Sequence, residues 1–159
     1  MYQLRPSTER DQAHILEIWR EAVDATHDFL TDVDRAAIEC EVSTLFAQVN
    51  LLLAVDNSDT PQGFMFLHEG HLEALFVDPT RHGQGIGKAL VQRALADHPQ
   101  LTTDVNEQNI QALAFYKRMG FECTGRSPCD GQGRPYPLLH LQHRSSGEPV
   151  LAAGNGTTN

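Results

Sequence analysis

The feature that most constrains the fold is a cluster of three glycines within five residues, Gly83, Gly85 and Gly87. An apolar, strand-like run ends just before the cluster, and a segment with helical spacing of apolar residues follows it. Successive amides without Cβ atoms can converge on an anion, and a helix N-terminus adds partial positive charge. Cationic or proton-donating side chains stand beside the glycines, namely Arg81, His82 and Lys88. The cluster therefore predicts a strand-to-helix turn that binds phosphate or pyrophosphate.

Two common nucleotide motifs do not match this turn. A Walker A loop needs a glycine at the position of His82 and a hydroxyl after Lys88, where this chain has Ala89. A dinucleotide fingerprint has the spacing GxGxxG, whereas the spacing here is GxGxG, past the midpoint of the chain. The alternative without a ligand is that the glycines only form a tight turn and a close helix contact.

The periodicity of apolar residues predicts an α/β (α+β) protein with a mixed sheet. Thr31 is positioned to cap a helix, Gly70 to form a hairpin turn and Gly120 to end a helix. We expect Trp19 and the run 64–66 in the core. Helices are predicted over 10–24, 32–48, 85–97 and 109–119, and strands over 2–5, 51–55, 62–67, 72–77, 101–105, 121–126 and 136–141.

Length and charge narrow the organisation and the partners. The 159 residues suit one domain, expected over 1–144, followed by a disordered tail over 145–159 that is rich in small polar residues. There are 12 Lys and Arg against 21 Asp and Glu, and 12 − 21 gives a net charge of −9. This sign disfavours nucleic acid as a partner and favours cationic substrates such as amines.

Cysteine and histidine usage points to a cytoplasmic protein without a metal. Three cysteines with no CxxC spacing fit reduced thiols better than disulfides. The eight histidines lack the HxxxH and HExxH spacings, so we expect no metal site. No apolar run has the length or flanks of a signal peptide or a membrane span, so no membrane contact is expected.

Two motifs resemble the GNAT superfamily of acetyl-CoA-dependent N-acetyltransferases. The run 75–79 followed by 82–87 is similar to the pyrophosphate motif of that family, R/Q-x-x-G-x-G/A, although His82 stands where Arg or Gln is usual. The run 109–121 is similar to its N-x-x-A-x-x-F-Y-x-x-x-G-F motif. Segments 23–30, 105–109 and 133–139 resemble small single-domain bacterial members. The resemblance covers residues 2–142 and implies the GNAT fold, a central mixed sheet of six to seven strands with about four helices.

The resemblance also implies how acetyl-CoA, the co-substrate, is held. The strand residues Leu75, Phe76 and Val77 would pair with the pantetheine arm, which Asn109 would reach from the other side. The amides of the turn would hold the pyrophosphate, a set that comprises His82, Gly83, Gln84, Gly85, Ile86, Gly87 and Lys88. His82 at the first position of the motif is expected to make cofactor binding weaker or pH-dependent.

The implied reaction is direct transfer of the acetyl group to a primary amine. Tyr116 would give a proton to the departing thiolate, and an amide near Phe76 or Val77 would stabilise the oxyanion. Glu73, an acid on an apolar strand, is a candidate buried base; the alternative is an edge-strand charge facing solvent. Candidates for the acceptor pocket are His27, Phe29 and Tyr136.

The acceptor would be a protein lysine or a small cationic amine, and the enzyme a monomer or homodimer. A non-catalytic acyl-CoA-binding or sensing module is the alternative function. An unrelated binder of a phosphate ligand is a third.

Overall fold

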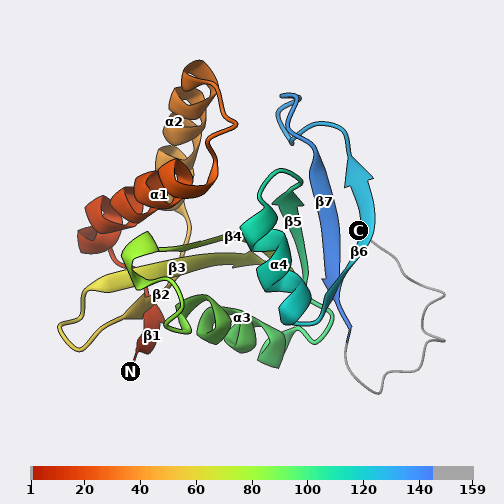
Figure 1. The fold of residues 1–159 in the computed structure, drawn as a ribbon. Coiled ribbons are helices and arrows are strands. Elements are labelled where there is room, and N and C mark those ends of the chain that lie inside the picture. Colours follow the sequence, from red (N-terminus) through yellow and green to blue (C-terminus); the bar gives the residue numbers. More distant parts are fainter. Residues whose placement is uncertain (1, 145–159) are drawn as a thin grey trace. The chain divides into compact units, whose positions relative to one another are not determined.

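The computed structural model describes residues 2–144, which form seven strands and four α-helices. The strands follow the hydrogen-bonded order β1-β2-β3-β4-β5-β7-β6 (Figure 1). The β4–β5 pair is parallel, whereas β1–β2, β2–β3, β5–β7 and β6–β7 are antiparallel. The mixed sheet and the four helices confirm the predicted fold class.

The chain divides into two compact units. Among the described residues, the first comprises 2–68 together with Glu73–Arg93, and the second comprises Glu69–Leu72 together with 94–144. The chain passes from one unit to the other within β4 (His71–Val77) and within α3 (Ile86–Asp97). That residues 1–144 behave as one domain stays a prediction, and the predicted tail over 145–159 lies outside the described residues.

The first unit holds the N-terminal strands and helices. Its elements are β1 (Gln3–Pro6), α1 (Gln12–Thr26), α2 (Asp32–Gln48), β2 (Leu52–Val55), β3 (Pro61–His68), most of β4 and the first two turns of α3. Aromatic and branched side chains from α1, α2, β2 and β3 form its core, where Phe46 meets Phe64 edge-on at 5.1 Å. Trp19 and Phe64 are buried as predicted, and Phe66 packs partly buried against them.

Side-chain caps set the limits of the first two helices. Helix α1 begins two residues later than predicted because Thr8 and Asp11 form a capping box around a single 3₁₀ turn. The helix ends at Thr26, whose hydroxyl donates 2.7 Å back to the carbonyl of Ala22. Helix α2 begins as predicted, because the Thr31 hydroxyl accepts a hydrogen bond from the Asp34 amide at 3.1 Å.

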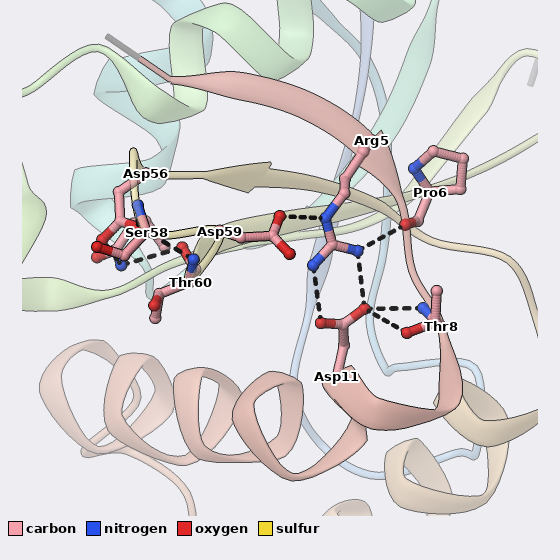
Figure 2. A network of polar contacts seen from close by, with 9 residues as sticks. Arg5, Pro6, Thr8, Asp11, Asp56, Ser58, Asp59 and Thr60 are labelled. Atoms are coloured by element: carbon pink, nitrogen blue, oxygen red, sulfur yellow. Dashed lines mark hydrogen bonds and ion pairs between the residues drawn. The ribbon is translucent and has the colours of Figure 1, made fainter.

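An arginine on β1 joins three segments of the first unit (Figure 2). The Arg5 guanidinium donates two hydrogen bonds, of 2.9 and 3.0 Å, to the carboxylate of Asp11 before α1. Its Nε donates 2.8 Å to Asp59 in the turn between β2 and β3. The Asp11 carboxylate also accepts the Thr8 amide at 2.8 Å. The hydrogen bonds from Arg5, and then those from Thr8, lower the pKa of Asp11 to about 2 despite its burial.

The second unit holds the C-terminal strands and helix α4 (Ile110–Arg118). Strand β5 (Thr102–Asn106) pairs in parallel with His71 and Leu72 of β4 and antiparallel with β7 (Leu138–His143), which pairs with β6 (Phe121–Ser127). Two glycines of this unit confirm predicted turns. Gly70, with a φ of 79°, forms the hairpin turn with Glu69, and Gly120, with a φ of 101°, follows the end of α4.

Strand β7 begins at Leu138, so the prediction that Tyr136 opens this strand was wrong. Tyr136 lies between Pro135 and Pro137, which have no N–H groups to donate to a neighbouring strand. Its own amide donates 2.7 Å to the carbonyl of Arg134 in a local turn. Among residues 2–144, no helix combines the length and the apolar character that crossing a membrane requires.

Candidate functional site

The glycine-rich turn begins where Asp78 ends β4. The Asp78 amide donates 2.9 Å to the carbonyl of Gln62 on β3, which fixes the end of the strand. The Asp78 carboxylate accepts both the amide and the hydroxyl of Thr80, at 2.9 and 2.8 Å, and so caps the 3₁₀ turn η2 (Pro79–Arg81). The chain therefore leaves the sheet through a defined turn.

The backbone conformation of this turn requires glycine at two positions. Gly83 and Gly85 have φ angles of 83° and 82°, in the left-handed region that side chains with a Cβ rarely adopt. No atom of the described residues lies within 4 Å of a Cβ built at either position. The turn is thus strained for any other residue and open on the side where a ligand can approach.

The turn leads the chain into the N-terminus of α3. The first hydrogen bond of the helical ladder runs from the amide of Ala89 to the carbonyl of Gly85, at 2.9 Å. The amides from Gly85 to Lys88 precede that bond and are left for an acceptor outside the helix. With the macrodipole, they form a set of donors suited to an anion. This arrangement bears out the strand-to-helix turn predicted from the sequence.

Close packing fixes the helix N-terminus against the sheet. A Cβ built on Gly63 of β3 would lie 2.8 Å from Cγ2 of Ile86, the first residue of α3. It would also lie 3.1 Å from the carbonyl oxygen of Phe76 and 3.3 Å from Cγ2 of Val77 on β4. The absence of a side chain at Gly63 therefore lets the end of β4 and the start of α3 approach β3.

The side chains of the turn are mostly exposed. His82, Gln84 and Lys88 are exposed, Arg81 is half-buried, and Ile86 is buried beneath them. The Tyr2 hydroxyl donates to Gln84 Oε1 and so restrains that side chain. Leu75, Phe76 and Val77 are half-buried on β4 in the same unit. The first unit thus contains most of the residues predicted to hold the cofactor.

Glu73 does not have the environment predicted for a buried base. Its side chain is exposed on β4, between the buried Leu72 and the half-buried Ala74. The expectation of a buried carboxyl was wrong because strand alternation turns this position to solvent, the alternative that the sequence left open. An exposed carboxylate can still attract a cation or accept a proton through water.

The predicted acceptor residues His27 and Phe29 contact one another after α1. Their rings lie 5.2 Å apart, and both side chains are half-buried. His27 Nδ1 lies 2.7 Å from the Thr26 hydroxyl, whose proton goes to the Ala22 carbonyl. Nδ1 therefore donates, and Nε2 of the neutral ring carries the lone pair. Burial lowers the pKa of His27, although Asp28 opposes the shift.

Tyr116 lies in the second unit and is buried on α4. Its ring meets Phe115 and Phe121 edge-on, at 5.0 and 5.2 Å. Its hydroxyl hydrogen-bonds the side chain of Thr103 on β5, which itself donates 2.9 Å to the Leu72 carbonyl. Burial raises the pKa of the Tyr116 hydroxyl well above its usual range, and the hydrogen bond with Thr103 offsets only part of that shift.

Two further predicted residues lie in the second unit. The Asn109 side chain accepts the Ala112 amide at 3.1 Å and caps α4, a structural role beside the predicted contact with the cofactor. Tyr136 is buried ahead of β7. Within residues 2–144, no group of three or more His, Cys, Asp or Glu side chains is arranged to hold a metal ion.

Two residues contribute to this site that were not predicted from the sequence. Thr103 gave no signal, because a threonine in a strand is ordinary and only the fold places it against Tyr116. No role in this site was assigned to Gly63 from the sequence. A glycine inside a strand can mark a close approach of another backbone, and that signal was present.

A scan against protein families agrees with the fold and the turn. The model described as "Acetyltransferase (GNAT) domain" matches residues 16–136, which is more than half of the chain. The chain therefore belongs to the GNAT family of acetyltransferases, as the two motifs indicated.

Curated relatives and solved structures match over nearly the whole chain. The "Peptidyl-lysine N-acetyltransferase YjaB" of Salmonella typhimurium is 52% identical over 89% of this chain and 97% of its own length. The YjaB of Escherichia coli is 46% identical over 88% of this chain and 95% of its length. The solution structure of apo-form YjaB from Escherichia coli has a TM-score of 0.88 at 44% identity, covering 92% of this chain and 99% of that one.

Proposed function

We propose that this protein transfers the acetyl group of acetyl-CoA directly to the side-chain amine of lysine residues in proteins. The observation that carries this proposal is the 52% identity to a peptidyl-lysine N-acetyltransferase over 97% of its length. The net charge of −9 supports a cationic acceptor, because lysine is protonated in solution. Small cationic amines are the other acceptors with this chemistry.

The donor side of the reaction belongs to the first unit. The amides from Gly85 to Lys88 would hold the pyrophosphate of acetyl-CoA, with Arg81 and Lys88 supplying positive charge. The backbone of Leu75–Val77 would pair with the pantetheine arm, and Asn109 would contribute a further contact. The PaiA N-acetyltransferase from Thermoplasma acidophilum, solved in complex with coenzyme A, has the same fold, with a TM-score of 0.72 at 17% identity.

Proton transfer requires an acid for the thiolate and a base for the ammonium. Tyr116 is the proposed acid, because its buried phenol stays protonated at neutral pH and can donate a hydrogen bond to the departing thiolate. Glu73, being exposed, suits the first encounter with the cationic acceptor. His27 offers a neutral Nε2 that can take up a proton. Phe29 and Tyr136 each stay candidates for apolar contact with the lysine side chain.

We place the enzyme in the cytoplasm, as a monomer or homodimer. Cys40, Cys123 and Cys129 are all free thiols, and two of them are exposed. Exposed thiols persist best in a reducing compartment.

The test is acetyl transfer to a defined peptide. The purified protein is incubated with acetyl-CoA and a peptide that carries one lysine and a blocked N-terminus, and peptide mass and thiol release are followed. The matched control peptide has norleucine in place of lysine, which removes only the amine. We expect a gain of about 42 Da, from one acetyl group in place of one hydrogen, on the lysine peptide alone. Tight calorimetric binding of acetyl-CoA without transfer to any lysine peptide or small amine would instead support an acyl-CoA sensor.

A further inference from the structure

Three polar side chains on neighbouring strands of the second unit form a continuous hydrogen-bonded row. Ser127 Oγ on β6 lies 2.7 Å from His140 Nε2 on β7. His140 Nδ1 lies 2.6 Å from Asp104 Oδ1 on β5. The hydroxyl thus contacts one ring nitrogen and the carboxylate contacts the other. This is the connectivity by which a serine nucleophile is activated in hydrolases of unrelated folds.

The strand register places the three side chains on one face. Asp104 pairs with His140, and Ser127 pairs with Leu138, two residues before His140. The register of β6 shifts between Cys123 and Gly125, so that one extra residue is accommodated there. Without that bulge the Ser127 side chain would lie on the opposite face, because a shift of one residue reverses the alternation.

A second histidine lies beside the carboxylate of the row. His71 Nε2 lies 3.4 Å from Asp104 Oδ2, and His71 Nδ1 lies 2.7 Å from the Thr102 hydroxyl. The carboxylate has no proton to give, so the neutral imidazole of His140 donates to it through Nδ1. His140 then has its proton on Nδ1 and the lone pair of Nε2 directed at Ser127 Oγ. That tautomer is the one that accepts a proton from the serine.

We propose that Ser127, activated by His140 and Asp104, is a nucleophile that accepts an acyl group from activated esters. Ser127 Oγ forms a bond to the acyl carbon while the bond from that carbon to the leaving oxygen breaks. His140 Nε2 takes the proton of the serine and passes it to the leaving oxygen. The products are an acyl ester of Ser127 and a free alcohol or phenol, so atoms and charge balance. This activity is separate from acetyl-CoA-dependent transfer to amines.

The sequence around the serine makes the ester long-lived. Pro128 follows Ser127 and has no N–H group, so the position after the nucleophile supplies no donor to an oxyanion. Each missing donor of this kind slows acyl transfer by about 10²–10³-fold. Hydrolysis of the acyl ester is slowed for the same reason, because its oxyanion also lacks this donor. The site is therefore built for a single, slow acylation rather than for rapid turnover.

The test uses p-nitrophenyl acetate, which does not require the acetyl-CoA site. We expect a burst of about one p-nitrophenolate per chain and an acetyl group mapped to Ser127 by peptide mass spectrometry. Asp104→Asn and His140→Gln, which keep side-chain size, should each slow acetylation of Ser127 at least about tenfold. Ser58, an exposed serine, is the reference within the same sample for unassisted acylation.

Two results would overturn the proposal. Ser127 could remain unmodified or react no faster than Ser58, or it could react equally fast in folded His140→Gln protein. Circular dichroism and thermal unfolding of each variant establish that the comparison is made on folded protein. The peptide acetylation assay, run in parallel on Ser127→Ala, separates this site from the proposed transferase, which should keep its activity in that variant.

Discussion

Gly63 on β3 lies so close to Ile86, the first residue of α3, that a Cβ on the glycine would be 2.8 Å from Cγ2 of the isoleucine. Ile86 is buried, and the carbonyl of Phe76 lies nearly as close, so neither neighbour can move without disturbing the turn between them. The amides from Gly85 to Lys88, called the amide cradle below, thus depend for their position on Gly63, which lies well before them in the sequence.

Gly63→Ala should therefore weaken acetyl-CoA binding without touching the ligand. The added methyl forces β4 or α3 to shift, and we expect a stability loss of about 1–3 kcal/mol, as for overpacked cores. Calorimetric titration with acetyl-CoA and urea unfolding measure the two effects. Gly131→Ala is the matched control, because no atom of the described residues lies within 4 Å of a Cβ there. Unchanged affinity in folded Gly63→Ala protein would disprove the link.

Gly85→Ala tests the cradle itself. Its φ of 82° makes any side chain strained, at about 1–2 kcal/mol, and the new methyl would enter the open space above the amides. Gly133→Ala is matched in backbone strain, with the same φ of 82° and the same open surroundings in another turn. We expect similar losses of stability in both variants but a raised acetyl-CoA dissociation constant only in Gly85→Ala. Equal affinities would show that the glycines serve only the turn.

Tyr116→Phe should separate catalysis from binding. Loss of the phenol removes the proposed acid, so kcat should fall by about 10²-fold or more while the affinity for acetyl-CoA stays unchanged. The lost hydrogen bond to Thr103 costs about 1 kcal/mol of stability. Thr103→Val removes the same hydrogen bond but keeps the phenol. A comparable fall of kcat in both variants would mean that the hydrogen bond, and not the acid, matters.

His27 should make stability depend on pH. Burial holds the pKa of the folded-state imidazole below its ordinary value of 6.5, so the unfolded chain binds the proton more readily. The contribution of His27 to stability is therefore complete above pH 6.5 and lost as pH falls from there through the folded-state pKa. The slope for one proton is at most about 1.4 kcal/mol per pH unit. Unfolding of His27→Gln between pH 5 and 7.5 should lack this slope, whereas His14→Gln, on the exposed side of the same helix, should keep it.

The ion pair of Arg5 with Asp11 should stabilise the fold down to strongly acidic pH. The pKa of Asp11 is about 2 in the folded protein against an ordinary value of 3.8, so its contribution to stability is complete above about pH 4 and lost as pH falls toward 2. That difference corresponds to about 2 kcal/mol, which Asp11→Asn should remove at pH 7. Asp59→Asn, an exposed partner of the same arginine, should cost no more than about 1 kcal/mol. Equal effects in both variants would contradict this assignment.

Local signals in the sequence predicted most of the elements and the turn. Thr31, Gly70, Asn109 and Gly120 each act through atoms of their own backbone or of residues a few positions away. Such interactions form in the same way wherever the segment lies in the fold. The prediction that a strand begins at Tyr136 was wrong for a reason that is also local. The two prolines beside Tyr136 are a local signal that outweighs an apolar pattern.

Local signals gave only part of the outcome for Glu73 and Gly63, and the row of Ser127, His140 and Asp104 had no local signal. Each depends on which residues face each other across strands, and a shift of one residue reverses every side chain. The bulge in β6 makes such a shift at Cys123 and Gly125. Local sequence signals were therefore enough for most of the elements, several of their caps and the glycine-rich turn, since these rest on short-range geometry. Only the tertiary structure decided which distant side chains meet, because strand register is set by packing of the whole sheet.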